Sequence, residues 1–234
     1  MRKIKTIISE FSKGEKQLWC ASVGVILLSF LLFDRSSYLT LIASLTGVTS
    51  LIFNAKGHPF GQLLMVAFSL LYGLISYTFA YYGEMITYLG MTAPMAVAAY
   101  ISWKRNPFGD GKAEVKVSQL SLAEHIFMWL LTAVVTAVFY FILKAFNTAN
   151  LLPSTISVTT SFLAVYLTFR RSPYYAIGYA ANDIVLIVLW VMASMENRAY
   201  ISVVACFAAF LVNDIYGFIC WKRMERRQAA CQES

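Results

Sequence analysis

Apolar residues in this chain gather into long runs that are separated by short polar segments. Eight runs are long enough to cross a bilayer, which takes about 20 mostly apolar residues. The predicted spans cover residues 18–33, 38–53, 61–80, 85–103, 122–143, 151–169, 174–193 and 199–221. A cleaved signal peptide is the alternative for the first run, but no small-x-small cleavage site follows it. We interpret it as a retained helix.

Composition agrees with this pattern. Hydrophobic residues make up 59% of the chain and charged residues only 13%, which is too apolar for an ordinary soluble domain. If the N-terminus is cytoplasmic, 16 of the 19 Lys and Arg residues fall on the cytoplasmic side, as membrane topology favours. The exceptions are Arg35, Lys144 and Arg198. We therefore expect both termini in the cytoplasm, and the net charge of +7 needs no nucleic acid partner.

Two segments of the chain repeat the same order of features. Each has a span, a loop with a proline, a second span, a short turn and a third span that ends in Trp-Lys-Arg. The prolines, Pro59 and Pro173, lie 114 residues apart, and the tryptophans, Trp103 and Trp221, lie 118 apart. Three spans reverse the direction of the chain, so the extra span at 122–143 lets both repeats enter the membrane in the same sense.

The sequence thus predicts an all-α integral membrane protein with eight transmembrane helices arranged 1+3+1+3, in which a linker helix joins two parallel three-helix repeats. The predicted units are an N-terminus with an extra first helix (1–37), a first bundle (38–106), a cytoplasmic loop with the linker helix (107–150), a second bundle (151–223) and a cytoplasmic tail (224–234).

Two Asn-Asp pairs lie inside predicted spans, each eight residues ahead of a tryptophan: Asn182-Asp183 and Asn213-Asp214. A carboxylate in a span costs about 3 kcal/mol on insertion scales, so it is kept mainly where it faces a polar cavity or a partner. We interpret Asp183 and Asp214 as parts of a solvated site inside the membrane. The two asparagines fit this site and a simple interhelical hydrogen bond equally well.

The outer turn Tyr81-Tyr82-Gly83-Glu84-Met85, the span that ends in Trp103 and the second unit that ends in Trp221 resemble the PnuC family of nicotinamide riboside transporters. The resemblance covers about residues 38–224 and rests on order, spacing and the repeat. It implies a relative of the SWEET sugar transporters, a homotrimer in the bacterial plasma (inner) membrane, and import of a vitamin precursor by facilitated diffusion. Phosphorylation inside the cell then traps the substrate. No cofactor is implied.

Nicotinamide riboside carries a pyridinium cation, which suits an aromatic face and a nearby anion, together with polar groups for the ribose. Trp190 lies about two turns after Asp183 on one helix face and is a candidate for stacking; the alternative is a place in the outer interfacial belt. We expect Trp103 and Trp221, beside a basic loop, to be belt residues. Further candidate contacts are Tyr72, Gln62, Asn182, Asn213 and Tyr216.

Four other residues carry narrower expectations. Glu84 at the outer turn is expected to be a solvated charge, with a gate as the alternative. Ser69 and Ser76 share a helix face with Tyr72 and are expected to pack between helices. Pro94 removes a backbone hydrogen bond in mid-span and predicts either a hinge or a fixed bend.

Other classes of function remain as alternatives. The chain has no HExxH, DDxxD, GxSxG or Walker pattern, so an enzyme is not predicted, and its cysteines have no spacing that indicates a metal. The sequence has no recognisable selectivity-filter motif of an ion channel. Substrate-binding subunits of vitamin importers usually lack the repeated three-helix unit. The substrate alternatives are thiamine, riboflavin or another nucleoside such as a deoxynucleoside. Transport coupled to protons through Asp183 or Asp214 is the alternative to uniport.

Overall fold

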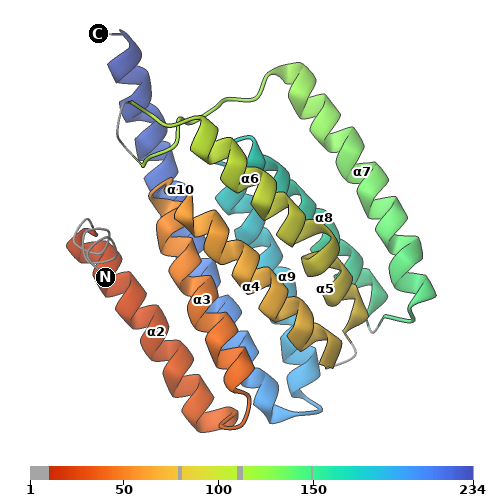
Figure 1. Ribbon diagram of the computed structural model, residues 1–234. Helices are drawn as coiled ribbons and strands as arrows, with labels where there is room; N and C mark the ends of the chain where they lie inside the picture. Colours follow the sequence, from red (N-terminus) through yellow and green to blue (C-terminus); the bar gives the residue numbers. More distant parts are fainter. Residues whose placement is uncertain (1–10, 79–80, 110–112, 149, 234) are drawn as a thin grey trace.

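The computed structural model describes residues 11–78, 81–109, 113–148 and 150–233, and they form a helical bundle (Figure 1). Within them, eight helical segments are long and apolar enough to cross a membrane, which confirms the predicted all-α class and number of spans. Residues 79 and 80 of the third predicted span, and Arg2, Lys3, Lys5 and Lys112 of the charge count, lie outside the described residues. The elements are α2 (Lys13–Phe33), α3 (Tyr38–Ala55), α4 (Phe60–Thr78), α5 (Tyr82–Thr87), the π-helix η1 (Tyr88–Thr92), α6 (Ala93–Arg105), α7 (Leu122–Ala145), α8 (Leu151–Phe169), α9 (Tyr175–Ser194), the 3-10 helix η2 (Arg198–Tyr200) and α10 (Ile201–Glu233).

Capping residues set the starts of two helices. Ser12 and Glu15 form a capping box at α2, and Ser121 and Glu124 form another at α7. The box at Ser12 starts α2 five residues before the hydrophobic run on which the predicted span 18–33 was based. α10 also differs from its prediction, because the segment expected to be a tail continues the helix to Glu233.

The fourth span is interrupted where the sequence has Pro94. A proline inside a helix has no N–H to donate and crowds the carbonyl four residues earlier. Here the backbone widens into the π-helix η1 just before α6, and the N–H of Ala93 bonds to the carbonyl oxygen of Tyr88, five residues back. The hydrogen-bond pattern therefore departs from that of an α-helix just before Pro94, and the choice between a hinge and a fixed bend stays a prediction.

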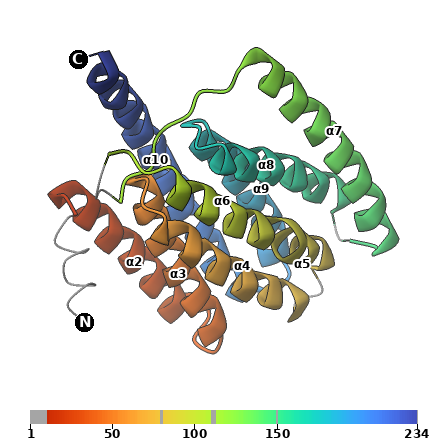
Figure 2. The same cartoon turned by 45° about the horizontal axis from the view of Figure 1, so that its top comes forward.

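The core lies between α3, α4, α9 and α10, with α6 and α8 beside it, while α2 and α7 lie at the periphery (Figures 1 and 2). α7 packs mainly against α8, and most of its apolar side chains are exposed, including Trp129, Leu130 and Phe141. Such a surface suits lipid rather than water.

One end of the bundle, which we call the loop end, carries two equivalent turns at residues 56–59 and 170–173. Gly57 and Arg171, 114 residues apart, both have a left-handed backbone, with φ of 64° and 59°. In each turn this residue donates its N–H to the carbonyl three residues earlier, Asn54 or Thr168, at 2.9 and 3.0 Å. The two turns therefore share a backbone conformation and a hydrogen bond as well as a following proline.

Two tryptophans join the repeats at the loop end. The indole N–H of Trp103 on α6 donates to the carbonyl oxygen of Thr168 at 2.8 Å, and that of Trp221 on α10 donates to Asn54 at 2.7 Å. Their rings pack together at 5.2 Å between centroids, and both side chains are 0% exposed. The expectation that they belong to an interfacial belt is wrong, because each indole closes the end of a helix in the other repeat.

The segment before α7 spans both turns. Val115 donates its N–H to the carbonyl oxygen of Gly57, and Ser118 donates to that of Arg171, both at 3.0 Å. Gln228, on the extension of α10, accepts from the N–H of Val117 at 2.8 Å and donates to the carbonyl oxygen of Val115 at 3.0 Å. The loop, the turns and α10 are thereby tied together.

Candidate functional site

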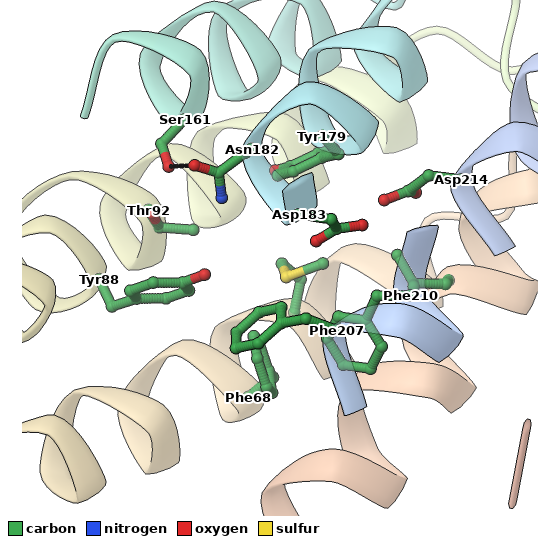
Figure 3. Close-up of a pocket in the computed structure, with 12 residues that line it drawn as sticks. Phe68, Tyr88, Thr92, Ser161, Tyr179, Asn182, Asp183, Phe207, Phe210 and Asp214 are labelled. Carbon is green, nitrogen blue, oxygen red and sulfur yellow. Dashed lines mark hydrogen bonds between the residues drawn. The ribbon is translucent and has the colours of Figure 1, made fainter. Parts of the chain in front are cut away.

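A small cavity of about 20 Å³ lies in the centre of the bundle. Side chains from α3, α4, η1, α8, α9 and α10 line it, so helices of both predicted repeats contribute (Figure 3). Its lining residues are Leu51, Met65, Phe68, Tyr88, Thr92, Ser161, Tyr179, Asn182, Asp183, Phe207, Phe210 and Asp214.

Two carboxyl groups form the acidic side of the cavity. Asp183 on α9 and Asp214 on α10 are each 4% exposed, and their side chains lie close together (Figure 3). The Oδ2 atom of Asp183 has no hydrogen-bond partner among the described residues. The ion pairs found in this part of the chain, Lys56–Glu15, Arg170–Glu124, Lys222–Glu225 and Arg227–Glu114, include neither aspartate. Among the described residues, no basic side chain thus forms an ion pair with either aspartate.

Asn182 is held by hydroxyl groups from α8. Ser157, Thr160 and Ser161 lie on one face of that helix and donate to Oδ1 of Asn182 at 3.2, 2.9 and 3.0 Å. The amide nitrogen of Asn182 is left pointing toward the cavity (Figure 3). This fixed orientation offers a donor to a polar group in the cavity, such as a hydroxyl.

Aromatic rings form the opposite wall. Phe68 packs against Tyr88 at 5.9 Å and against Phe210 at 5.4 Å between ring centroids, both edge-on. Tyr88 and Thr92 belong to η1, so the interruption before Pro94 places them at the cavity. A carboxyl pair that faces aromatic rings across a small space can hold an organic cation.

Of the predicted site residues, Asn182, Asp183 and Asp214 are brought together at the cavity. Tyr72 and Trp190 form a pair just beyond the aromatic wall, in which the indole N–H of Trp190 donates to the Tyr72 hydroxyl at 2.7 Å. Trp190 is buried and packs against the rings of Tyr81 and Tyr200, so its side chain does not lie in an exposed belt.

The other three candidates lie elsewhere. Gln62 donates to Oδ1 of Asn54 at 2.9 Å, Asn213 donates to the Ser22 hydroxyl on α2 at 2.8 Å, and Tyr216 lies half-buried on α10. The first two contacts are interhelical hydrogen bonds, the structural alternative considered for asparagine. Substrate contacts by Gln62, Asn213 and Tyr216 stay predictions, for which this cavity offers no support.

Some polar residues differ from their sequence-based expectations. Glu84 is 3% exposed, so the expectation of a solvated charge is wrong: the turn folds it inward against α8. Ser69 and Ser76 are buried as expected for packing, although their hydroxyls have no partner among the described residues. Tyr88, Tyr179 and Ser161 were missed at the cavity. The i, i+3, i+4 spacing of Ser157, Thr160 and Ser161 was a signal for a polar face on α8.

Known proteins with similar sequences are named as transporters. Residues 37–223 match the family described as nicotinamide mononucleotide transporter. The nicotinamide riboside transporter PnuC of Neisseria mucosa is 26% identical over 223 residues, which cover 90% of this chain and 84% of that protein. The protein of the same name from Haemophilus influenzae is 25% identical over 196 residues, covering 82% of each chain.

The fold is also similar to a solved structure. The crystal structure of the vitamin B3 transporter PnuC matches with a TM-score of 0.82 and 24% identity, covering 93% of this chain and 94% of that chain. The predicted resemblance to PnuC is confirmed, and so is the prediction of a transporter rather than an enzyme. The chain is a multi-pass membrane protein that belongs to the nicotinamide mononucleotide transporter family.

Proposed function

We propose that this chain carries nicotinamide riboside across the membrane and that the central cavity is its substrate site. The observation that carries the proposal is the pairing of Asp183 and Asp214, buried without a basic partner in the described bundle, opposite the aromatic wall. The pyridinium ring supplies the missing positive charge and stacks on the aromatic side. The amide of Asn182 serves the ribose hydroxyls. The relatives named for nicotinamide riboside support this substrate.

The proposed architecture is 1+3+1+3, with α3, α4 and α5–α6 as one bundle, α8, α9 and α10 as the other, and α7 as the linker. The equivalent turns at Gly57 and Arg171 support it. Pockets that hold small molecules measure about 300–1,000 Å³, whereas this cavity measures about 20 Å³. Substrate entry therefore requires the bundles to move apart, as parallel repeats do in alternating access.

The loop end is proposed to face the cytoplasm, which places both termini inside a bacterial plasma membrane. Lys56, Lys104, Arg105, Lys116 and Arg170 lie in or beside the loops of that end, as the positive-inside rule favours. A homotrimer is proposed from the family resemblance, and the exposed apolar surface of α7 suits lipid or a neighbouring copy. Uniport only brings the electrochemical potential of the substrate to equilibrium, so phosphorylation in the cytoplasm is proposed to trap the substrate.

Calorimetry in detergent tests the site. Asp183→Asn keeps the shape and removes the charge, and we expect it to weaken nicotinamide riboside binding by about tenfold or more, since hydrogen bonds to charged groups are worth about 1.5–3 kcal/mol. Asp34→Asn is the matched control, because Asp34 is partly exposed in the turn after α2 and its contacts to Ser36 and Ser37 use an oxygen that Asn retains. Equal binding by both variants would contradict the site.

Proton coupling is the second candidate mechanism, and the closeness of Asp183 and Asp214 favours it because two neighbouring negative charges repel unless a proton or cation intervenes. Uptake into liposomes of the purified chain, with and without a pH gradient, separates the two. Gradient-driven accumulation above equilibrium excludes uniport, and an absence of any uptake favours a substrate-binding subunit. Thiamine, riboflavin and deoxynucleosides in the same assay test the alternative substrates.

A further inference from the structure

Glu84 is a third buried carboxyl group, separate from the aspartate pair. It lies on α5, one turn before Tyr88, and its side chain is 3% exposed. It is close enough to Tyr72, Tyr88 and Ser157 to interact with each. Its Oε2 atom has no hydrogen-bond partner among the described residues. A buried carboxyl oxygen without a partner is unfavourable, and a bound water, ion or ligand would satisfy it.

Among the described residues, no basic side chain supplies that partner. The ion pairs of the described residues involve other acids, and those of Lys56, Arg170, Lys222 and Arg227 belong to helix ends and loops at the loop end. Glu84 lies near the start of the fourth span, at the opposite end of the bundle. No described basic side chain thus forms an ion pair with Glu84, which leaves this carboxyl group available to a cation that enters at that end.

Glu84 is connected to the cavity on two sides. Tyr88, next to it, lines the cavity, and the Tyr72 and Tyr88 rings stand 4.4 Å apart between centroids. Ser157, its other neighbour, donates to Asn182 at 3.2 Å. A substrate that enters from the opposite end of the bundle reaches Glu84 before it reaches Asp183.

We propose that Glu84, with the rings of Tyr72 and Tyr88, forms a second cation position on the substrate path, outside the cavity. This inference rests on the proposed function, since the cation is the pyridinium ring of nicotinamide riboside. The carboxylate attracts the ring, the tyrosines stack on it, and displacement of Tyr88 passes it to Asp183 and Asp214. Glu84 thereby selects organic cations over neutral molecules of the same shape.

The experiment compares nicotinamide riboside with its reduced dihydropyridine form, which has the same ribose and no ring charge. Binding of both is measured by calorimetry for the parent chain, Glu84→Gln, Glu84→Asp and the control Glu124→Gln. Glu124 is a partly exposed acid on α7, away from the cavity. We expect Glu84→Gln to lower the preference for the charged form by about tenfold or more. Glu84→Asp should restore part of that preference, Glu124→Gln should keep all of it, and binding of the reduced form should not change.

Other outcomes overturn the inference. If Glu84→Gln weakens both forms equally, Glu84 has only a structural role, and melting temperatures of the variants show whether folding has suffered. The Glu84 position is wrong, while the proposed function stands, in two cases in which the parent chain binds nicotinamide riboside. In the first, the parent chain shows no preference for the charged form over the reduced form. In the second, Glu84→Gln keeps the preference that the parent shows. If the parent binds neither form, the proposed function fails, and the Glu84 position fails with it.

Discussion

Gly47 on α3 lets two aromatic rings of the cavity wall approach the helix backbone. A Cβ atom added there would meet Cζ of Phe210 and would stand 3.0 Å from both Cε2 of Phe210 and Cδ2 of Phe68. Carbon atoms pack best at about 3.5–4.0 Å, so Gly47→Ala must displace rings that line the cavity. The substitution therefore tests whether packing of α3 against α4 and α10 shapes the site.

The size of the effect follows from two opposing terms. Overpacking of a tight core costs about 1–3 kcal/mol, whereas Ala is favoured over Gly in a helix by about 1 kcal/mol. Gly24→Ala on α2 is the matched control, because no atom lies within 4 Å of its added Cβ and only the helix term applies. The difference between the two variants isolates the overpacking. For a chain of this size, about 1 kcal/mol corresponds to about 2–4 °C in melting temperature.

We expect Gly47→Ala to melt about 2–12 °C below Gly24→Ala in detergent. Nicotinamide riboside binding, measured by calorimetry, should weaken about fivefold or more in Gly47→Ala and stay at the parent value in Gly24→Ala. If the two variants melt and bind alike, the rings have room to move and the cavity wall is not as closely packed as the structure indicates.

Two further predictions concern the loop end. Trp221→Phe removes the N–H that bonds to the carbonyl oxygen of Asn54 at 2.7 Å, so the free energy of unfolding in detergent should fall by about 1–2 kcal/mol. The control Trp129→Phe, on the exposed face of α7, should have little effect. Equal melting of the two variants would count against the reciprocal bonds. Gln228→Ala removes the acceptor for the Val117 N–H at 2.8 Å, so amide hydrogen exchange at Val117 should accelerate by about fivefold or more. The control is Gln119→Ala, because Gln119 is exposed and has one contact at 3.3 Å. This control should leave the exchange rate at Val117 unchanged.

The spans were predictable because a run of apolar residues is a local property and its length matches a bilayer. The first residues of the helices were harder to predict, because the capping box at Ser12 extends α2 into a polar segment that a hydropathy pattern ignores. The extension of α10 was missed for the same reason. Beyond Trp221 its buried residues, Met224 and Gln228, are too few to appear as an apolar run, and contacts with the loop hold them.

The acidic side of the site was predictable, but its individual neighbours were not. The cost of a carboxylate in lipid marks Asp183 and Asp214 wherever they point. Adjacent residues on a helix point about 100° apart, so Asn213 bonds to α2 while Asp214 faces the cavity. Which of the two faces inward depends on how α10 is rotated in the bundle. Tyr88 and Tyr179 gave no signal, because aromatic residues are common throughout the spans.

The distribution of hydrogen bonds between the repeats suits the proposed carrier. At the loop end, the bonds of Trp103 and Trp221 and the loop contacts at Val115 and Ser118 hold the repeats together. Toward the opposite end, the Trp190–Tyr72 bond joins α9 to α4. Each such bond is worth about 0.5–1.5 kcal/mol net, so the hydrogen bonds at either end add only a few kcal/mol to the cost of opening it. Contacts of that strength can break and form again when substrate binding favours another conformation, which a carrier with alternating access requires.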